Sequence, residues 1–139
     1  MWKDMLYVLC LYPVVQILGT IRHELSHAAA AKLAGYKILE LRVFPGFNNK
    51  EFYWGYCRYD KPTTSTISLA PYWVAAVNCV LGVPLAIYTY ETLPFFWWAL
   101  LTVVMVVSPL FDILYNFFKW KLDNRGDFAK AQQLKRWEK

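Results

Sequence analysis

The chain has 139 residues, of which 58% are hydrophobic and only 18% are charged. A water-soluble domain this short cannot bury so much apolar surface, because small domains have little interior. The same composition excludes intrinsic disorder. The three cysteines form no CxxC pair, which excludes a disulfide-stabilised secreted scaffold. The composition therefore predicts an integral membrane protein.

Three apolar stretches are each long enough to form a transmembrane helix, which needs about 20 residues. We expect the helices at about residues 5–34, 66–88 and 93–118. The first stretch ends before Gly35, a typical helix stop. Its apolar run is longer than the core of a signal peptide, so we interpret it as a retained membrane anchor. The predicted fold class is an integral membrane, mainly α protein with three transmembrane helices.

The segment between the first two predicted helices has the pattern of a β-hairpin, at about residues 37–60. Leu39–Val43 alternates apolar and polar residues, and a turn cluster at 45–49 precedes an aromatic-rich stretch at 52–59. We expect this hairpin to lie at the membrane surface. Residues 1–118 then form the membrane core, and 119–139 form a basic tail with a short amphipathic helix capped by Asp127.

The positively charged residues predict the orientation of the chain, because cytoplasmic segments are enriched in Lys and Arg. They gather in the hairpin loop and the tail: Lys37, Arg42, Lys50, Arg58 and Lys61 in the loop, and Lys119, Lys121, Arg125, Lys130, Lys135, Arg136 and Lys139 in the tail. We therefore expect both segments in the cytoplasm, the N-terminus outside, and the chain in the cell membrane. Membrane topology explains this positive charge, so we expect no nucleic-acid partner.

The sequence His-Glu-Leu-Ser-His at residues 23–27 contains both histidines of the chain. On a helix, positions i and i+4 share a face, so His23 and His27 can bind one Zn²⁺. Glu24 between them is placed to act as general base toward a water molecule that the metal activates. Charged residues inside a membrane helix are costly and usually functional. We therefore predict a catalytic site with one zinc ion per chain.

A catalytic zinc site needs a third protein ligand. Asp112 is the acidic residue of the third predicted helix, and it lies at about the same depth below the cytoplasmic edge as His27. Two alternatives stay open: Asp112 pairs with Arg22 without any metal, or the ligand is Asp123 or Cys57. If Asp112 is the ligand, Arg22 is a neighbouring partner that supports it.

These motifs resemble those of the site-2 protease family of intramembrane zinc metalloproteases. Residues 23–35 are similar to the family's first motif, 67–71 to the start of its second helix, and 108–112 to the third helix with its ligand Asp. The resemblance implies a three-helix core, zinc held by His23, His27 and Asp112, and a transmembrane or membrane-anchored protein as substrate in the lipid bilayer. It also implies that Asn78 takes the place of the family's polar Asn in the second helix.

The sequence thus predicts a zinc metalloendopeptidase that hydrolyses a peptide bond in or near the transmembrane segment of a membrane protein. One alternative is a catalytically inactive relative that binds a membrane partner. A metal transporter or a membrane oxidase is a third possibility. It is disfavoured because three helices make a poor transport path, and because the chain has too few histidines for a diiron centre. The sequence does not indicate an oligomeric state.

Overall fold

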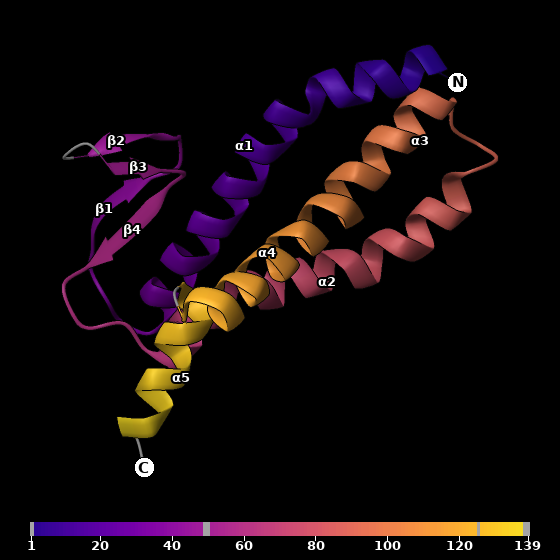
Figure 1. Ribbon diagram of the computed structural model, residues 1–139. Coiled ribbons are helices and arrows are strands. Elements are labelled where there is room, and N and C mark those ends of the chain that lie inside the picture. Colours follow the sequence, from indigo (N-terminus) through magenta and orange to yellow (C-terminus); the bar gives the residue numbers. More distant parts are fainter. Residues whose placement is uncertain (1, 49–50, 125, 138–139) are drawn as a thin grey trace.

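The computed structural model describes residues 2–48, 51–124 and 126–137 and is mainly helical (Figure 1). Three helical stretches of it are long and apolar enough to cross a membrane. They are α1 (Trp2–Leu33), α2 (Ser65–Thr89) and a continuous third stretch made of α3 (Phe95–Thr102), the π-helical turn η1 (Val103–Val107) and α4 (Ser108–Asp123). This confirms the predicted mainly α fold. The third stretch continues to Asp123, past the expected end at 118.

The predicted hairpin is present between α1 and α2. It consists of β1 (Ile38–Arg42), β2 (Gly46–Asn48), β3 (Glu51–Tyr53) and β4 (Tyr56–Tyr59). β1 pairs antiparallel with β4, with Leu41 opposite Cys57, and β2 pairs antiparallel with β3, with Phe47 opposite Phe52. The four strands thus form one long hairpin made of two ladders.

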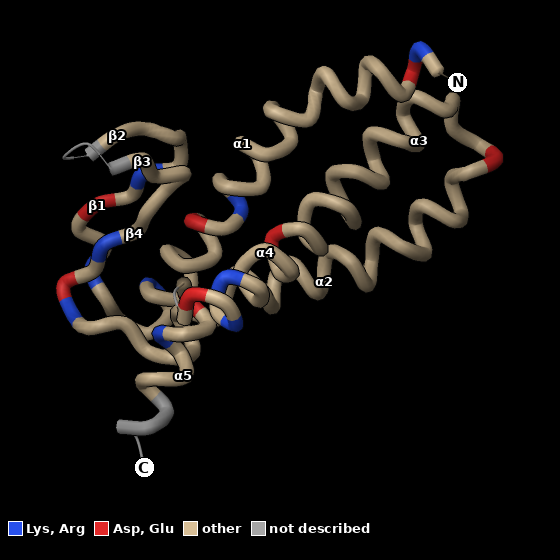
Figure 2. The backbone as a smooth tube through the Cα atoms, viewed as in Figure 1, with Lys and Arg blue, Asp and Glu red and all other residues tan. Residues whose placement is uncertain are grey.

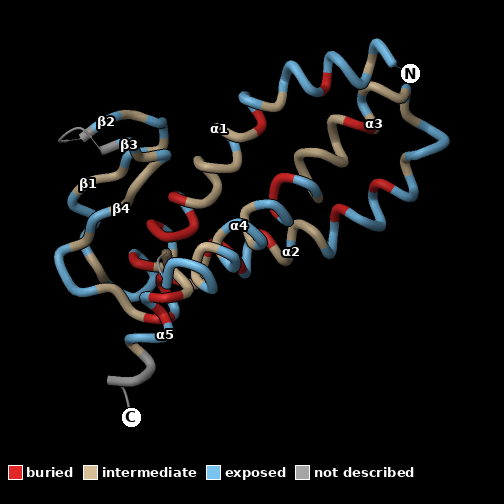
Figure 3. Tube along the Cα trace, viewed as in Figure 1, coloured by how far each residue is buried: buried red, intermediate tan, exposed pale blue. Residues whose placement is uncertain are grey.

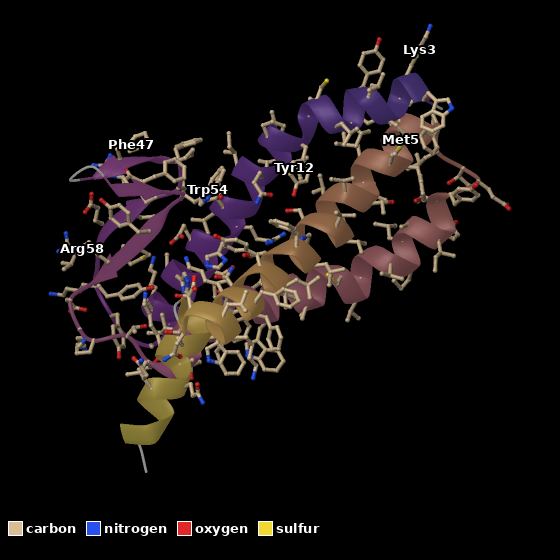
Figure 4. The ribbon with its side chains drawn as sticks, in the orientation of Figure 1. Lys3, Met5, Tyr12, Phe47, Trp54 and Arg58 are labelled. Carbon is tan, nitrogen blue, oxygen red and sulfur yellow. The ribbon has the colours of Figure 1, made fainter. Side chains whose placement is uncertain are left out.

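The hairpin lies alongside α1, and its place relative to the membrane surface stays a prediction. A Cβ atom added to Gly55 would lie 3.0 Å from Cγ2 of Thr20 and 2.8 Å from Cγ of Glu24, so this turn touches α1 directly. Thr20 precedes the end of α1 by about 20 Å of helix. Trp54, next to this turn, lies at the end of the hairpin that faces α1, whereas Arg58 points away from the helix (Figure 4).

The helices pack through small side chains, as is common in membrane proteins. Figure 3 shows that buried positions gather where α1, α2, α4 and α5 (Asp127–Trp137) meet. The buried small residues include Ala28, Ala31, Ser68, Ala75 and Ser108. Large apolar side chains are instead exposed along the helices, as expected for surfaces that face lipid.

The tail contains the predicted short helix, and this helix folds back onto the bundle. After α4, Asn124 (φ 50°) and Gly126 (φ 88°) adopt the left-handed conformation that a tight turn requires. The chain then enters α5, which packs against α2 and α4. Ala129 and Ala131 of α5 are buried. The helix itself begins at Asp127, the residue predicted as its cap.

Charged residues concentrate at the end of the bundle that carries the hairpin and α5 (Figure 2). The opposite end has charges only near the N-terminus and in the turn between α2 and α3. Among the positively charged residues on which the predicted orientation depends, Lys50, Arg125 and Lys139 lie outside the described residues. The orientation of the chain in a membrane stays a prediction.

Candidate metal centre

His23 and His27 lie one helical turn apart on α1, and their ring centroids are 5.0 Å apart. Their Nε2 atoms converge on the carboxylate of Asp127 at the start of α5. Oδ2 of Asp127 is 3.3 Å from Nε2 of His23 and 3.4 Å from Nε2 of His27. The three residues each offer one ligand atom, and these atoms lie within 4.8 Å of one another. The structure thus brings the two predicted histidines together with Asp127, which the sequence predicted only as a helix cap.

The other ring nitrogen of each histidine is held by an acceptor. Nδ1 of His27 lies 2.8 Å from the carbonyl oxygen of Ile67, and Nδ1 of His23 lies 2.9 Å from Oδ2 of Asp112. Carbonyl and carboxylate oxygens only accept hydrogen bonds, so Nδ1 carries the proton in both rings. Nε2 of each ring faces Oδ2 of Asp127, so a metal bound there would replace the proton on Nε2 while Nδ1 keeps its hydrogen bond, the usual arrangement of metal-binding histidines.

Pro71 explains why the Ile67 carbonyl is available to His27. In an α-helix this carbonyl accepts a hydrogen bond from the residue four positions later, which is Pro71 in α2. Proline has no N–H group, so the Ile67 carbonyl lacks that donor. Pro71 is fully buried in the bundle, and His27 supplies the missing hydrogen bond. The segment 67–71 therefore contributes to the site through its backbone.

Asp112 lies on the far side of the His23 ring from Asp127. Besides His23 it contacts the guanidinium group of Arg22 at 3.4 Å and the side-chain amide of Asn116 at 3.1 Å. The pair with Arg22, which the sequence left open as an alternative, is therefore present. A carboxylate that accepts from Nδ1 orients the ring and is not placed beside Nε2. Asp127 is therefore a further candidate for the third ligand beside Asp112, which contacts Nδ1 of His23 and whose role as a ligand stays a prediction.

Asp127 is positioned by the turn at Gly126 and by α2. The hydroxyl group of Tyr72 donates to Oδ2 of Asp127 at 3.0 Å, and the ammonium group of Lys130 lies 3.8 Å from Oδ1. Burial of the Asp127 carboxyl raises its pKa, but hydrogen bonds from His23 and His27 outweigh this effect and hold the pKa well below its ordinary value. The carboxylate is therefore in the ionised form that a metal ligand requires.

Glu24 is buried, with 8% of its surface exposed, and lies beside the two histidines. In the part of the chain that the structure describes, no hydrogen bond to its carboxylate is present. The hairpin turn at Gly55 covers the side chain of Glu24, so close that only a residue without Cβ fits there. A buried carboxylate that no protein donor occupies can accept a proton from a water molecule.

The remaining predicted residues lie outside this cluster. Asn78 is more than one turn beyond Tyr72 on α2, about 9 Å along the axis, and no hydrogen bond joins it to the described residues of the site. Asp123 is exposed at the end of α4. Cys57 is half-buried in β4, and burial raises the pKa of its thiol, which disfavours the thiolate that binds metals.

The fold has three helical stretches that are long and apolar enough to cross a membrane, with a His-His-Asp cluster at one end. A family profile described as Peptidase M50B-like matches residues 2–120, and the chain belongs to this family. The match confirms the relationship to the site-2 proteases. It ends before α5, so the assignment of Asp127 rests on the structure alone. No curated protein and no solved structure gave a significant match.

The donor set fits the zinc ion that is general in this family. Two imidazole nitrogens and one carboxylate oxygen are ligands that Zn²⁺ prefers, and catalytic zinc sites commonly use three protein ligands with one open position. The three ligand atoms converge from α1 and α5. The outer hydrogen bonds at Nδ1 orient Nε2 of both rings toward Asp127.

Proposed function

We propose that the chain is an intramembrane zinc metalloprotease that hydrolyses a peptide bond in or near the transmembrane segment of another membrane protein. The observation that carries this proposal is the convergence of His23, His27 and Asp127 next to the buried carboxylate of Glu24. A partner-binding protein does not need a general base beside a metal site. Membership of a peptidase family supports the same function.

Each side chain has a distinct role in the proposed reaction. His23, His27 and Asp127 hold the metal, which when bound lowers the pKa of water and polarises the substrate carbonyl group. Glu24 accepts a proton from the attacking water and passes it to the leaving amine. Asp112 accepts from His23 and stabilises its orientation, while Arg22 neutralises Asp112 within the apolar surroundings.

The proposed topology places this chemistry on the cytoplasmic side of the cell membrane. The hairpin and the tail, which carry most positive charges, would be cytoplasmic and the N-terminus outside. His23 precedes the end of α1 by about 15 Å, so the scissile bond would lie within the membrane near this face. A substrate helix hides its amide groups, so it must unwind locally before hydrolysis.

The test of this function is cleavage of a single-span reporter peptide with a helix-destabilising segment near its cytoplasmic end. With purified protein in liposomes, we expect cleavage that a zinc chelator stops and added zinc restores. A reporter that is cleaved equally well with and without the chelator would contradict the metalloprotease assignment. A zinc-loaded protein that cleaves no such reporter would favour the partner-binding alternative.

The contact between the hairpin and Glu24 leads to a prediction about Gly55. In Gly55→Ala the new Cβ would lie 2.8 Å from Cγ of Glu24 and 2.8 Å from the carbonyl oxygen of Arg42, so the hairpin or the base must shift. Because small displacements of catalytic groups are costly, we expect the cleavage rate to fall by about 10- to 100-fold. Zinc affinity should stay within about twofold of wild type, since Gly55 touches no proposed ligand.

Gly46→Ala is the matched control for this prediction. Gly46 lies in the same hairpin, but a Cβ there would meet the phenol ring of Tyr53, the far end of a flexible side chain. We expect this variant to cleave at nearly the wild-type rate. Equal rates for Gly55→Ala and wild type would show that the hairpin does not position the base.

A further inference from the structure

Tyr72 joins α2 to the part of α5 that carries the proposed third ligand. Its side chain is buried, with 6% of its surface exposed. Its hydroxyl group lies 3.0 Å from Oδ2 of Asp127, the same oxygen atom that both Nε2 atoms approach. A carboxylate oxygen can only accept, so Tyr72 is the donor. The phenol therefore holds the atom on which metal binding would depend.

The ring of Tyr72 contacts α5 and α1 at the same time. It stacks on the ring of Phe128, with centroids 4.3 Å apart and planes at 26°, and meets the His23 ring edge-on at 5.5 Å. Phe128 in turn stacks on Trp120 of α4 at 6.0 Å. One side chain thus contacts two consecutive residues at the start of α5, Asp127 and Phe128, as well as one of the histidines.

We infer that Tyr72 is a positioning residue: it docks the start of α5 on the bundle and orients the Asp127 carboxylate toward both histidines. This inference rests on the proposed function. Asp127 follows the turn at Gly126 and does not belong to the three transmembrane helices, so its approach to the histidines depends on how α5 is held. Partners that orient metal ligands typically contribute 10- to 100-fold to metal affinity.

The test compares the zinc affinity of purified Tyr72→Phe with that of wild type, using titration against a chelator of known affinity. Phenylalanine keeps the stacking on Phe128 and removes only the hydroxyl group. We expect zinc to bind at least about tenfold more weakly. Tyr115→Phe is the matched control, because Tyr115 is exposed on α4, and it should bind zinc like wild type.

A double substitution separates orientation of Asp127 from a general structural role. In an Asp127→Ala background the hydroxyl group has no carboxylate to hold, so adding Tyr72→Phe should not lower the residual zinc affinity further. An equal further loss in that background would show that Tyr72 acts through the fold and would overturn the inference. So would a zinc affinity of Tyr72→Phe within about twofold of wild type. A wild type without zinc affinity would instead overturn the proposed function itself.

Discussion

Replacing Glu24 with glutamine is expected to lower the cleavage rate by about 10²- to 10⁴-fold, the usual contribution of a general base. Glutamine has nearly the same shape but cannot accept the proton from water. Zinc binding should be retained, because Glu24 is not one of the three proposed ligands. The measurement is the initial rate of reporter cleavage by zinc-loaded protein, together with its zinc content.

Glu91→Gln is the control for the loss of a carboxylate in general. Glu91 lies in the turn between α2 and α3, at the opposite end of the bundle from the site, and is exposed. We expect its cleavage rate to equal that of wild type. A Glu24→Gln protein that still cleaves at the wild-type rate would exclude Glu24 as the base.

The second large effect concerns the two aspartates near His23. Asp127→Ala removes a proposed ligand and should weaken zinc binding by more than about 100-fold, whereas Asp112→Ala removes a hydrogen bond to a ligand and should weaken it by about 10- to 100-fold. Which of the two substitutions causes the larger loss of zinc affinity distinguishes the two assignments of the third ligand. A larger loss in Asp112→Ala would return the third ligand to the third transmembrane helix.

Asp123→Ala provides the matched control for this comparison. Asp123 lies four residues before Asp127 and is exposed at the end of α4. It does not belong to the group of possible metal ligands found among the described residues. Its removal changes the net charge of the tail by the same amount as removal of Asp127. We expect its zinc affinity to match wild type, which would show that local charge alone does not explain the effect of Asp127→Ala.

Much of the fold and half of the site could be predicted from local sequence patterns. Long apolar stretches indicate transmembrane helices, and the spacing of His23 and His27 indicates that they share one face of a helix. Both patterns lie within a single element of the chain. The Arg22–Asp112 pair was an alternative that the sequence left open, because opposite charges buried in a membrane favour each other.

The candidate ligand Asp127 could not be found in the same way, because its position depends on how the chain returns after the third helical stretch. Asp112 was the first candidate for the ligand because it lies at about the same depth below the cytoplasmic edge as His27. Asp127 had only the ordinary features of a helix cap. The left-handed conformations at Asn124 and Gly126 reverse the chain and bring Asp127 back to α1. The sequence signal for this turn, glycine immediately before aspartate, was present but is not specific.

Two contributions of α2 to the site could also not be predicted from sequence patterns. Asn78 was expected to be the polar residue of this helix at the site, but Tyr72 is the α2 side chain that contacts Asp127. Pro71 acts by leaving a backbone carbonyl free for His27. The roles of Tyr72 and Pro71 cannot be predicted from residue type, because tyrosines and prolines in membrane helices usually serve packing and interfacial roles.

The most direct test of the central claim is the zinc content of freshly purified protein, measured by elemental analysis of wild type and Asp127→Ala. The geometry predicts about one zinc ion per wild-type chain, because the three candidate ligand atoms lie within 4.8 Å of one another. It predicts almost none in Asp127→Ala. Wild-type protein that neither contains zinc nor takes it up, or an Asp127→Ala variant that keeps a full zinc ion, would contradict the proposed centre.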